Sequence, residues 1–230
     1  MIKAVLLDFN GVVVDDEQIQ CEAYRDVFKG HGIELTDEGY YSRMGMNDRA
    51  FVTSVFEEGG QTPDEATIAA CIEQKTDAWR GRVSDNPPLF DGIENFIKKC
   101  SAEMAVGLVS MARRSEIDLV LERTGLAGEF AVILSAEDIS THKPDPECYR
   151  EGFRQIDLYR IARSHLPMVH NECLVIEDSP AGVMAGKGAD LPVLAVETSV
   201  DSSALREAGA DAVTQNLNDW FPESLRRVFA

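Results

Sequence analysis

Short, almost uninterrupted apolar runs recur along this chain and alternate with segments of helical spacing. The first run covers residues 3–9 and contains the carboxylate of Asp8, directly before the turn pair Asn10-Gly11. An apolar run of this length, closed by a glycine turn, is typical of a buried strand. Further strands are predicted near residues 104–110, 130–134, 173–177, 192–196 and 212–213. Helical spacing predicts a C-terminal helix and helices near residues 91–101, 114–124, 145–164 and 180–188.

The segment between the first two predicted strands has a different pattern. Helical spacing covers residues 15–31, 48–58 and 64–80, and Asp85-Asn86-Pro87-Pro88 ends this helical stretch. The rest of the chain alternates strands with helices, which implies a parallel sheet covered by helices on both faces. The sequence therefore predicts an α/β fold in two units. These are a parallel-sheet core, residues 1–14 and 88–230, and an inserted α-helical cap domain, residues 15–87.

Composition changes this picture mainly by excluding partners. The 230 residues carry a formal net charge of −18, which argues against nucleic acid because such binding needs a basic face. There is no apolar run long enough to span a membrane. The first apolar run also meets Asp8 too early for a signal peptide, so we expect a cytoplasmic protein with no membrane partner. The five cysteines are scattered and include no CxxC pair, which indicates neither a disulfide framework nor a zinc site.

Polar residues that can carry chemistry end several of the predicted strands. Asp8 ends the first strand, Ser110 ends the second, and Glu177-Asp178 ends the strand over 173–177. Lys143 lies in a His-Lys-Pro-Asp-Pro segment just before a predicted helix. Ligands of open α/β sheets bind at the carboxyl ends of the strands, where a carboxylate can act as nucleophile or metal ligand. The alternative roles are structural: a turn residue, a helix N-cap, a surface lysine and an acidic pair at a helix N-terminus.

The order of these residues along the chain resembles the four motifs of the haloacid dehalogenase superfamily, in its Mg²⁺-dependent phosphatase and phosphomutase branch. The resemblance covers almost the whole chain and implies a Rossmann-like core with a helical cap inserted after the first motif. It implies that Asp8 is a nucleophile that forms an aspartyl-phosphate, while Ser110 and Lys143 hold the phosphoryl group. The Mg²⁺ ligands are then Asp8, Asp178, the backbone carbonyl of Asn10 and, directly or through water, Glu177.

Asn10 departs from the family pattern, in which the residue two positions after the nucleophile is an Asp that acts as general acid and base. A neutral amide donates hydrogen bonds but delivers no proton, and losing a positioned general acid typically removes about 10²–10⁴-fold in rate. The resemblance therefore implies a phosphohydrolase of a small phosphorylated metabolite, sugar phosphates included, that is weakened by Asn10. An Asn10→Asp reversion is expected to raise alkyl-phosphate turnover by about 10²-fold or more.

The segment from Arg43 to Arg49 resembles the substrate-specificity loop of the family's cap. Arg49 is the residue expected to reach a substrate anion or hydroxyl, with a helix salt bridge as its alternative role. Gln20 stands where β-phosphoglucomutases have a substrate-sensing His, which together with Asn10 counts against a mutase.

Three other interpretations stay open. One is an impaired member that binds a phospho-metabolite or a protein without turnover. Another is a related hydrolase of a different carbon–heteroatom bond on the same scaffold, and the third is an engineered Asp-to-Asn change at Asn10. For the assembly we expect a monomer or a weak homodimer.

Overall fold

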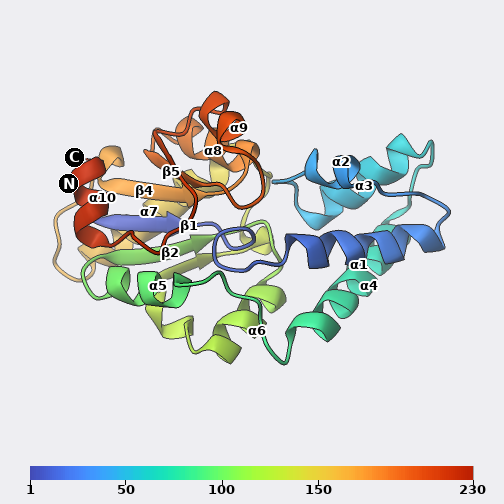
Figure 1. The fold of residues 1–230 in the computed structure, drawn as a ribbon, viewed down its shortest axis with the longest axis horizontal. Helices are drawn as coiled ribbons and strands as arrows, with labels where there is room; N and C mark the ends of the chain where they lie inside the picture. Colours follow the sequence, from blue (N-terminus) through green and yellow to red (C-terminus); the bar gives the residue numbers. More distant parts are fainter. Residues whose placement is uncertain (230) are drawn as a thin grey trace.

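A parallel six-stranded sheet forms the centre of the computed structural model, which describes residues 1–229 (Figure 1). The strands lie in the order β3-β2-β1-β4-β5-β6, so β1 is central, between β2 and β4. Their bounds are β1 Ala4–Leu7, β2 Ala105–Val109, β3 Val132–Leu134, β4 Cys173–Glu177, β5 Val193–Val196 and β6 Ala212–Thr214. The chain leaves β1 for β2 on one side and returns to β4 on the other. Such a switch point is where open α/β sheets bind ligands.

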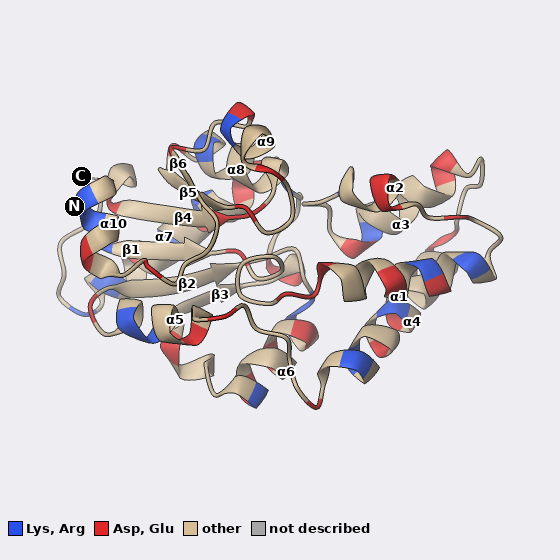
Figure 2. Cartoon of the chain, in the orientation of Figure 1, with Lys and Arg blue, Asp and Glu red and all other residues tan. Residues whose placement is uncertain are grey.

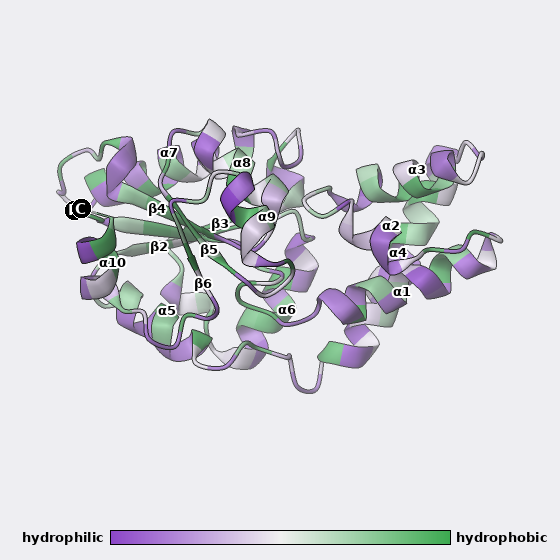
Figure 3. Cartoon of the chain, turned by 45° about the horizontal axis from the view of Figure 1, so that its top comes forward, coloured by the Kyte–Doolittle hydropathy of each residue, from purple (hydrophilic) through white to green (hydrophobic). Residues whose placement is uncertain are grey.

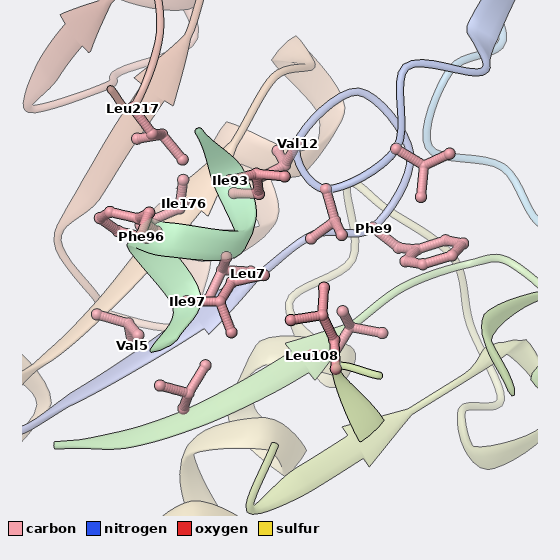
Figure 4. Close-up of a cluster of buried hydrophobic side chains, with 14 of the residues drawn as sticks. Val5, Leu7, Phe9, Val12, Ile93, Phe96, Ile97, Leu108, Ile176 and Leu217 are labelled. Atoms are coloured by element: carbon pink, nitrogen blue, oxygen red, sulfur yellow. The ribbon is translucent and has the colours of Figure 1, made fainter. Parts of the chain in front are cut away.

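Alternation along β1 creates two separate apolar layers. Val5 and Leu7 belong to the cluster on one face of the sheet, where they lie against helix α5, Ile93–Ser101 (Figure 4). Ala4 and Leu6 belong to the cluster on the opposite face. All four side chains are buried, because a central parallel strand has helices on both sides. The apolar run of the sequence is thus a strand that is covered on both faces.

The helices of the core divide between these two faces. Helices α5, α6 (Arg114–Thr124) and α10 (Pro222–Val228) contribute to the layer that contains Val5. Helices α7 (Glu147–Ile161), α8 (Pro180–Gly188) and α9 (Ser202–Glu207) contribute to the layer that contains Leu6. Three short 3₁₀ turns complete the core, at Ala127–Glu129, Ala136–Asp138 and His170–Glu172. Figure 3 shows the strands as a hydrophobic centre between these helices.

Four helices between β1 and α5 form a body beside the carboxyl end of the sheet (Figure 1). They are α1 Glu17–Gly30, α2 Asp37–Tyr41, α3 Asp48–Glu58 and α4 Glu65–Val83. They enclose an aromatic core of their own, in which Tyr24 stacks on Phe51 at 4.2 Å between ring centroids. The predicted α/β fold with an inserted helical cap is confirmed. The exact domain limits stay a prediction, and Ala230 lies outside the described residues.

Helix α2 of the cap and helix α9 of the core were not expected from the sequence. Helix α2 has five residues and α9 has six, which is too short for an apolar period to show. Both begin at a capping side chain: Thr36 accepts a hydrogen bond from Gly39 N, and Asp201 accepts one from Ala204 N. The local signal for each helix is thus its N-cap.

The outer surface of the cap is charged with both signs (Figure 2). Arg82 of α4 pairs with two carboxylates of α1, with Asp26 at 3.0 Å and with Glu22 at 3.8 Å. Within the part of the chain that is described, no helix combines the length and the apolar character needed to cross a membrane.

Candidate active site

The carboxyl ends of three neighbouring strands bring the predicted residues to one place. Leu7 of β1 lies in register with Leu108 of β2 and with Ile176 of β4, so the residues that follow these positions share one edge. The backbone N–H of Asp8 donates to the Ile176 carbonyl at 3.0 Å. Five of the predicted residues then line one pocket between sheet and cap: Asp8, Asn10, Ser110, Lys143 and Asp178.

Lys143 connects two carboxylates from different strands. Its Nζ lies 2.9 Å from Asp8 Oδ2 and 2.5 Å from Glu177 Oε1, and the side chain is buried. Burial alone lowers the pKa of an ammonium group, but the two carboxylates raise the pKa of Lys143 above its usual range. Lys143 is therefore a fixed positive charge beside Asp8.

Glu177 accepts hydrogen bonds on both of its oxygens. Oε1 accepts from Lys143 at 2.5 Å and from the Tyr149 hydroxyl at 2.8 Å. Oε2 accepts from the backbone N–H of Asp178 and from the N–H and hydroxyl of Ser179 at 3.0–3.2 Å. Burial raises the pKa of Glu177, but Lys143 and these hydrogen bonds lower it below its usual value. This geometry favours a role for Glu177 in holding Lys143 over a direct metal contact.

The acidic groups at this edge fit a divalent cation. Carboxylate oxygens of Asp8, Glu177 and Asp178 lie within 4.8 Å of one another. Burial raises the pKa of Asp8 to about 7 and that of Asp178 well above its usual value, and neighbouring carboxylates add to both shifts. Within residues 1–229 the backbone carbonyl of Asn10 accepts no hydrogen bond. Hard oxygen donors crowded in this way match the ligand preference of Mg²⁺.

Gly11 allows the nucleophile loop to approach Asp178. Its φ is +73°, and a Cβ at this position would lie 1.9 Å from Asp178 Oδ2. The Gly11 carbonyl accepts a hydrogen bond from Thr198 Oγ1 at 2.5 Å, and the Ser199 hydroxyl donates to Asp178 Oδ2. Thr198 and Ser199 were missed by the sequence analysis, because nothing local marks the loop after β5 as part of the site.

Asn10 faces a carboxylate that the motif analysis did not weigh. Its Nδ2 donates to Asp16 Oδ1 at 2.9 Å and to Oδ2 at 3.0 Å. Asp16 is fully buried and also accepts from Gln20 Nε2 at 3.1 Å and from Trp79 Nε1 at 2.6 Å. The carboxyl group therefore lies at position 16 instead of position 10, and three donors from the loop, α1 and α4 hold it. Burial raises the pKa of Asp16, and these three hydrogen bonds act in the opposite direction.

Ser110 lies in the pocket, whereas Arg49 lies outside it. The Ser110 hydroxyl is buried, accepts from Ala112 N at 3.0 Å and lines the pocket. Arg49 lies on the surface of α3, where its guanidinium pairs with Glu65 of α4 at 2.5 Å. The structure does not bring Arg49 into the pocket. Its ion pair with Glu65 is the helix salt bridge that the sequence offered as the alternative role of Arg49. Arg43 lines the pocket.

A buried ion cluster at the cap–core boundary was also missed. Lys75 Nζ of α4 lies 2.9 Å from Glu116 Oε1 of α6 and 3.0 Å from Asp48 Oδ1 of α3, and all three residues line the pocket. A signal for it exists in the sequence, because Cys71, Lys75 and Trp79 recur at helical spacing. A lysine on an apolar helix face indicates a buried acidic partner.

The sheet order and the inserted cap define a Rossmann-like α/β fold, and a buried carboxylate–lysine cluster lies at the carboxyl edge of its sheet. The haloacid dehalogenase-like hydrolase family model matches residues 5–196, so the chain belongs to this family. The predicted membership and the hydrolase class are thus confirmed.

Several relatives that match over most of their own length carry phosphatase names. The chain is 28% identical to a phosphorylated carbohydrates phosphatase of Thermotoga maritima, covering 93% of this chain and 94% of that protein. It is 27% identical to a validoxylamine A 7'-phosphate phosphatase of Streptomyces hygroscopicus, covering 95% and 96%. It is also 30% identical to the chloroplastic protein SUPPRESSOR OF QUENCHING 1 of Arabidopsis thaliana, covering 95% of this chain but spanning only 20% of that protein.

Solved structures share the fold. A β-phosphoglucomutase of Clostridium difficile superposes with a TM-score of 0.84 at 22% identity, covering 100% of this chain and 97% of that one. CbbY of Rhodobacter sphaeroides in complex with phosphate gives a TM-score of 0.80 at 20% identity, covering 95% and 96%. At these identities the likeness concerns the arrangement of sheet and cap.

Proposed function

We propose that this protein is a Mg²⁺-dependent phosphohydrolase that acts on a small phosphorylated metabolite through an aspartyl-phosphate. The observation that carries the proposal is the position of Asp8 Oδ2, 2.9 Å from the buried Lys143 ammonium and beside Asp178. A carboxylate next to a fixed cation can attack phosphorus while the cation neutralises the phosphoryl oxygens.

Each residue of the pocket has its own role in the proposed reaction. Asp8 supplies the oxygen that forms a bond to phosphorus, and Lys143 and the Ser110 hydroxyl stabilise charge on the phosphoryl group. Asp8, Asp178 and the Asn10 carbonyl are the groups that would hold Mg²⁺. When bound, that ion neutralises the carboxylates and the substrate phosphate, which an acidic chain would otherwise repel. Glu177 orients Lys143 through its hydrogen bonds.

Two unpartnered acceptors support a polyhydroxylated substrate such as a sugar phosphate. Among residues 1–229, Gln20 Oε1 and Asp48 Oδ2 are the buried side-chain atoms without a hydrogen-bond partner, and both residues line the pocket. A buried acceptor without a donor is costly, and substrate hydroxyls would supply the donors. The name of the Thermotoga maritima relative also refers to phosphorylated carbohydrates.

The test is a phosphatase assay over a panel of sugar phosphates, polyol phosphates and p-nitrophenyl phosphate with Mg²⁺. Asp8→Asn keeps the shape of the side chain and should abolish release of phosphate from every substrate. Phosphate release that is unchanged in Asp8→Asn would overturn the proposed nucleophile. Rejection of all polyol esters in favour of an apolar phosphate would overturn the substrate class.

The position of Asn10 favours a second candidate, a protein that binds a phospho-metabolite without turnover. The Asn10 side chain is committed to Asp16 and carries no acidic proton. Calorimetry with the same panel separates the two candidates, since the binder would retain a sugar phosphate intact over hours. The cytoplasmic setting, the monomeric or weakly dimeric state and the absence of a nucleic-acid partner stay predictions of the sequence.

A further inference from the structure

The proposed reaction needs a proton that the nucleophile loop does not supply. An alkoxide leaving group must be protonated as its bond to phosphorus breaks. Asn10 carries no acidic proton, and Asp16 accepts hydrogen bonds from the side chains of Asn10, Gln20 and Trp79. Asp16 is fully buried and does not line the pocket, so its carboxyl group cannot reach the leaving oxygen of a substrate.

Glu17 is the next carboxyl group along the chain, and it lies in the pocket. It begins α1 and lines the same pocket as Asp8 and Asn10. The Tyr40 hydroxyl donates to Glu17 Oε2 at 2.7 Å, which fixes the carboxyl group from α2. Within residues 1–229 the carboxyl group has no other hydrogen-bond partner, so Oε1 is left for a ligand. Glu17 is therefore both anchored and available.

We propose that Glu17 carries out the acid–base step of the proposed phosphohydrolase, in place of the residue at position 10. This rests on the proposed function and extends it. In the first half-reaction an Asp8 oxygen forms a bond to phosphorus and the bond from phosphorus to the leaving oxygen breaks. The proton of the Glu17 carboxylic acid moves to that oxygen. In the second half-reaction a water oxygen attacks phosphorus, the bond to Asp8 breaks, and the water proton returns to Glu17.

The surroundings of Glu17 support its protonated state at neutral pH. Burial raises the pKa of Glu17 to about 8, and the charges of Asp16 and Asp8 add to this shift. The Tyr40 hydrogen bond and the Lys75 ammonium act in the opposite direction. Titratable groups from several parts of the chain interact electrostatically with Glu17. They are Asp8 of the nucleophile loop, Asp16 and Cys21 at the start of the cap, Tyr40 and Tyr41 of α2, Lys75 of α4, and Asp178 after β4. A carboxylic acid with this pKa suits catalysis near pH 7.

The decisive experiment compares two leaving groups in Glu17→Gln. A sugar phosphate releases an alkoxide that needs a proton, whereas p-nitrophenyl phosphate releases a stable phenolate. We expect kcat for the sugar phosphate to fall by about 10²–10³-fold and that for p-nitrophenyl phosphate by less than about fivefold. Glu22→Gln removes an exposed carboxylate from the same helix and is the matched control, with unchanged rates on both substrates.

A pH profile supplies a second measurement that does not depend on removing Glu17. In the wild type, kcat/KM for the sugar phosphate should decrease above a pKa near 8, because the acid must be protonated. Tyr40→Phe removes a hydrogen bond that favours the carboxylate, so this limb should move to higher pH.

The outcomes separate this inference from the proposed function. An equal loss on both substrates in Glu17→Gln would overturn the proton role while leaving the phosphatase intact. If the alkaline decrease of kcat/KM occurs at the same pH in Tyr40→Phe as in the wild type, the proton role of Glu17 would likewise be overturned. A wild-type protein that releases phosphate from neither substrate would remove the proposed function, and this inference with it.

Discussion

The amide of Asn10 donates to both oxygens of the buried Asp16 carboxylate, at 2.9 and 3.0 Å. This contact joins the nucleophile loop to the start of the cap, and Trp79 of α4 donates to the same carboxylate at 2.6 Å. An amide at position 10 therefore supplies Asp16 with a donor, whereas a carboxyl group there would remove this donor and raise the pKa of Asp16 further. The hydrogen bonds between Asn10 and Asp16 therefore alter the expected effect of the Asn10→Asp substitution.

Asn10→Asp is expected to destabilise the fold instead of simply restoring activity. It replaces the amide donor by a second carboxyl group next to Asp16, whose pKa burial already raises, and the free energy of unfolding should fall by about 2 kcal/mol. Urea denaturation at pH 7.5 measures this loss. Asn10→Asp/Asp16→Asn exchanges the two groups and keeps the hydrogen bond, so it should recover most of the stability. A double variant no more stable than Asn10→Asp would contradict the pairing.

Asp178→Ala is expected to abolish Mg²⁺ binding. Asp178 supplies one of the three clustered carboxylates, and its raised pKa in the metal-free protein reflects burial and the charges of Glu177 and Asp8. Isothermal calorimetry measures the affinity of the wild type and the variant. Asp15→Ala, which removes an exposed carboxylate near the same loop, should bind Mg²⁺ as the wild type does. Equal affinity in Asp178→Ala would remove Asp178 from the metal site.

Much of the fold and the centre of the candidate site follow from short-range patterns. The ends of apolar runs locate Asp8, Ser110 and Glu177, because parallel strands in register bring their carboxyl ends to one edge. Side chains that meet only in three dimensions could not be found this way. Lys75 and Glu116 are 41 residues apart, and no local pattern joins them.

The position of Arg49 shows a second limit of sequence patterns. A motif locates a residue along the chain but not the direction in which its side chain points. Arg49 turns to Glu65, and Arg43, six residues earlier, lines the pocket instead. The preference of each arginine for a partner depends on where α3 and α4 pack, which the local sequence does not encode.

Arg43→Ala is expected to affect substrate binding more than Arg49→Ala does. Arg43 lines the pocket, and three partners outside the pocket lining, Ser54, Glu58 and the Gly39 carbonyl, hold its guanidinium at 2.5–2.9 Å. Its removal should raise KM for a sugar phosphate about tenfold, equivalent to about 1.4 kcal/mol. Arg49→Ala removes an exposed ion pair and should change KM by less than about twofold. A larger effect at Arg49 would mean that the cap moves and carries Arg49 to the substrate.

The stability of the metal-free protein should decrease as pH rises from about 4.5 to 8. Glu17 has a folded-state pKa of about 8, above its ordinary value of 4.5, so the folded state retains a proton that the unfolded chain has lost. The stabilisation that this retained proton gives the folded state is fully present below the unfolded-state pKa of 4.5. It is lost as pH rises through the folded-state pKa of about 8. Thermal denaturation in a chelator, from pH 5 to pH 8.5, measures the slope. Glu17→Gln removes this proton linkage, so its slope should be shallower and its melting temperature at pH 8.5 higher than that of the wild type. Glu22→Gln should follow the wild-type curve. A Glu17→Gln slope as steep as that of the wild type would mean that Glu17 is ionised in the folded protein at neutral pH.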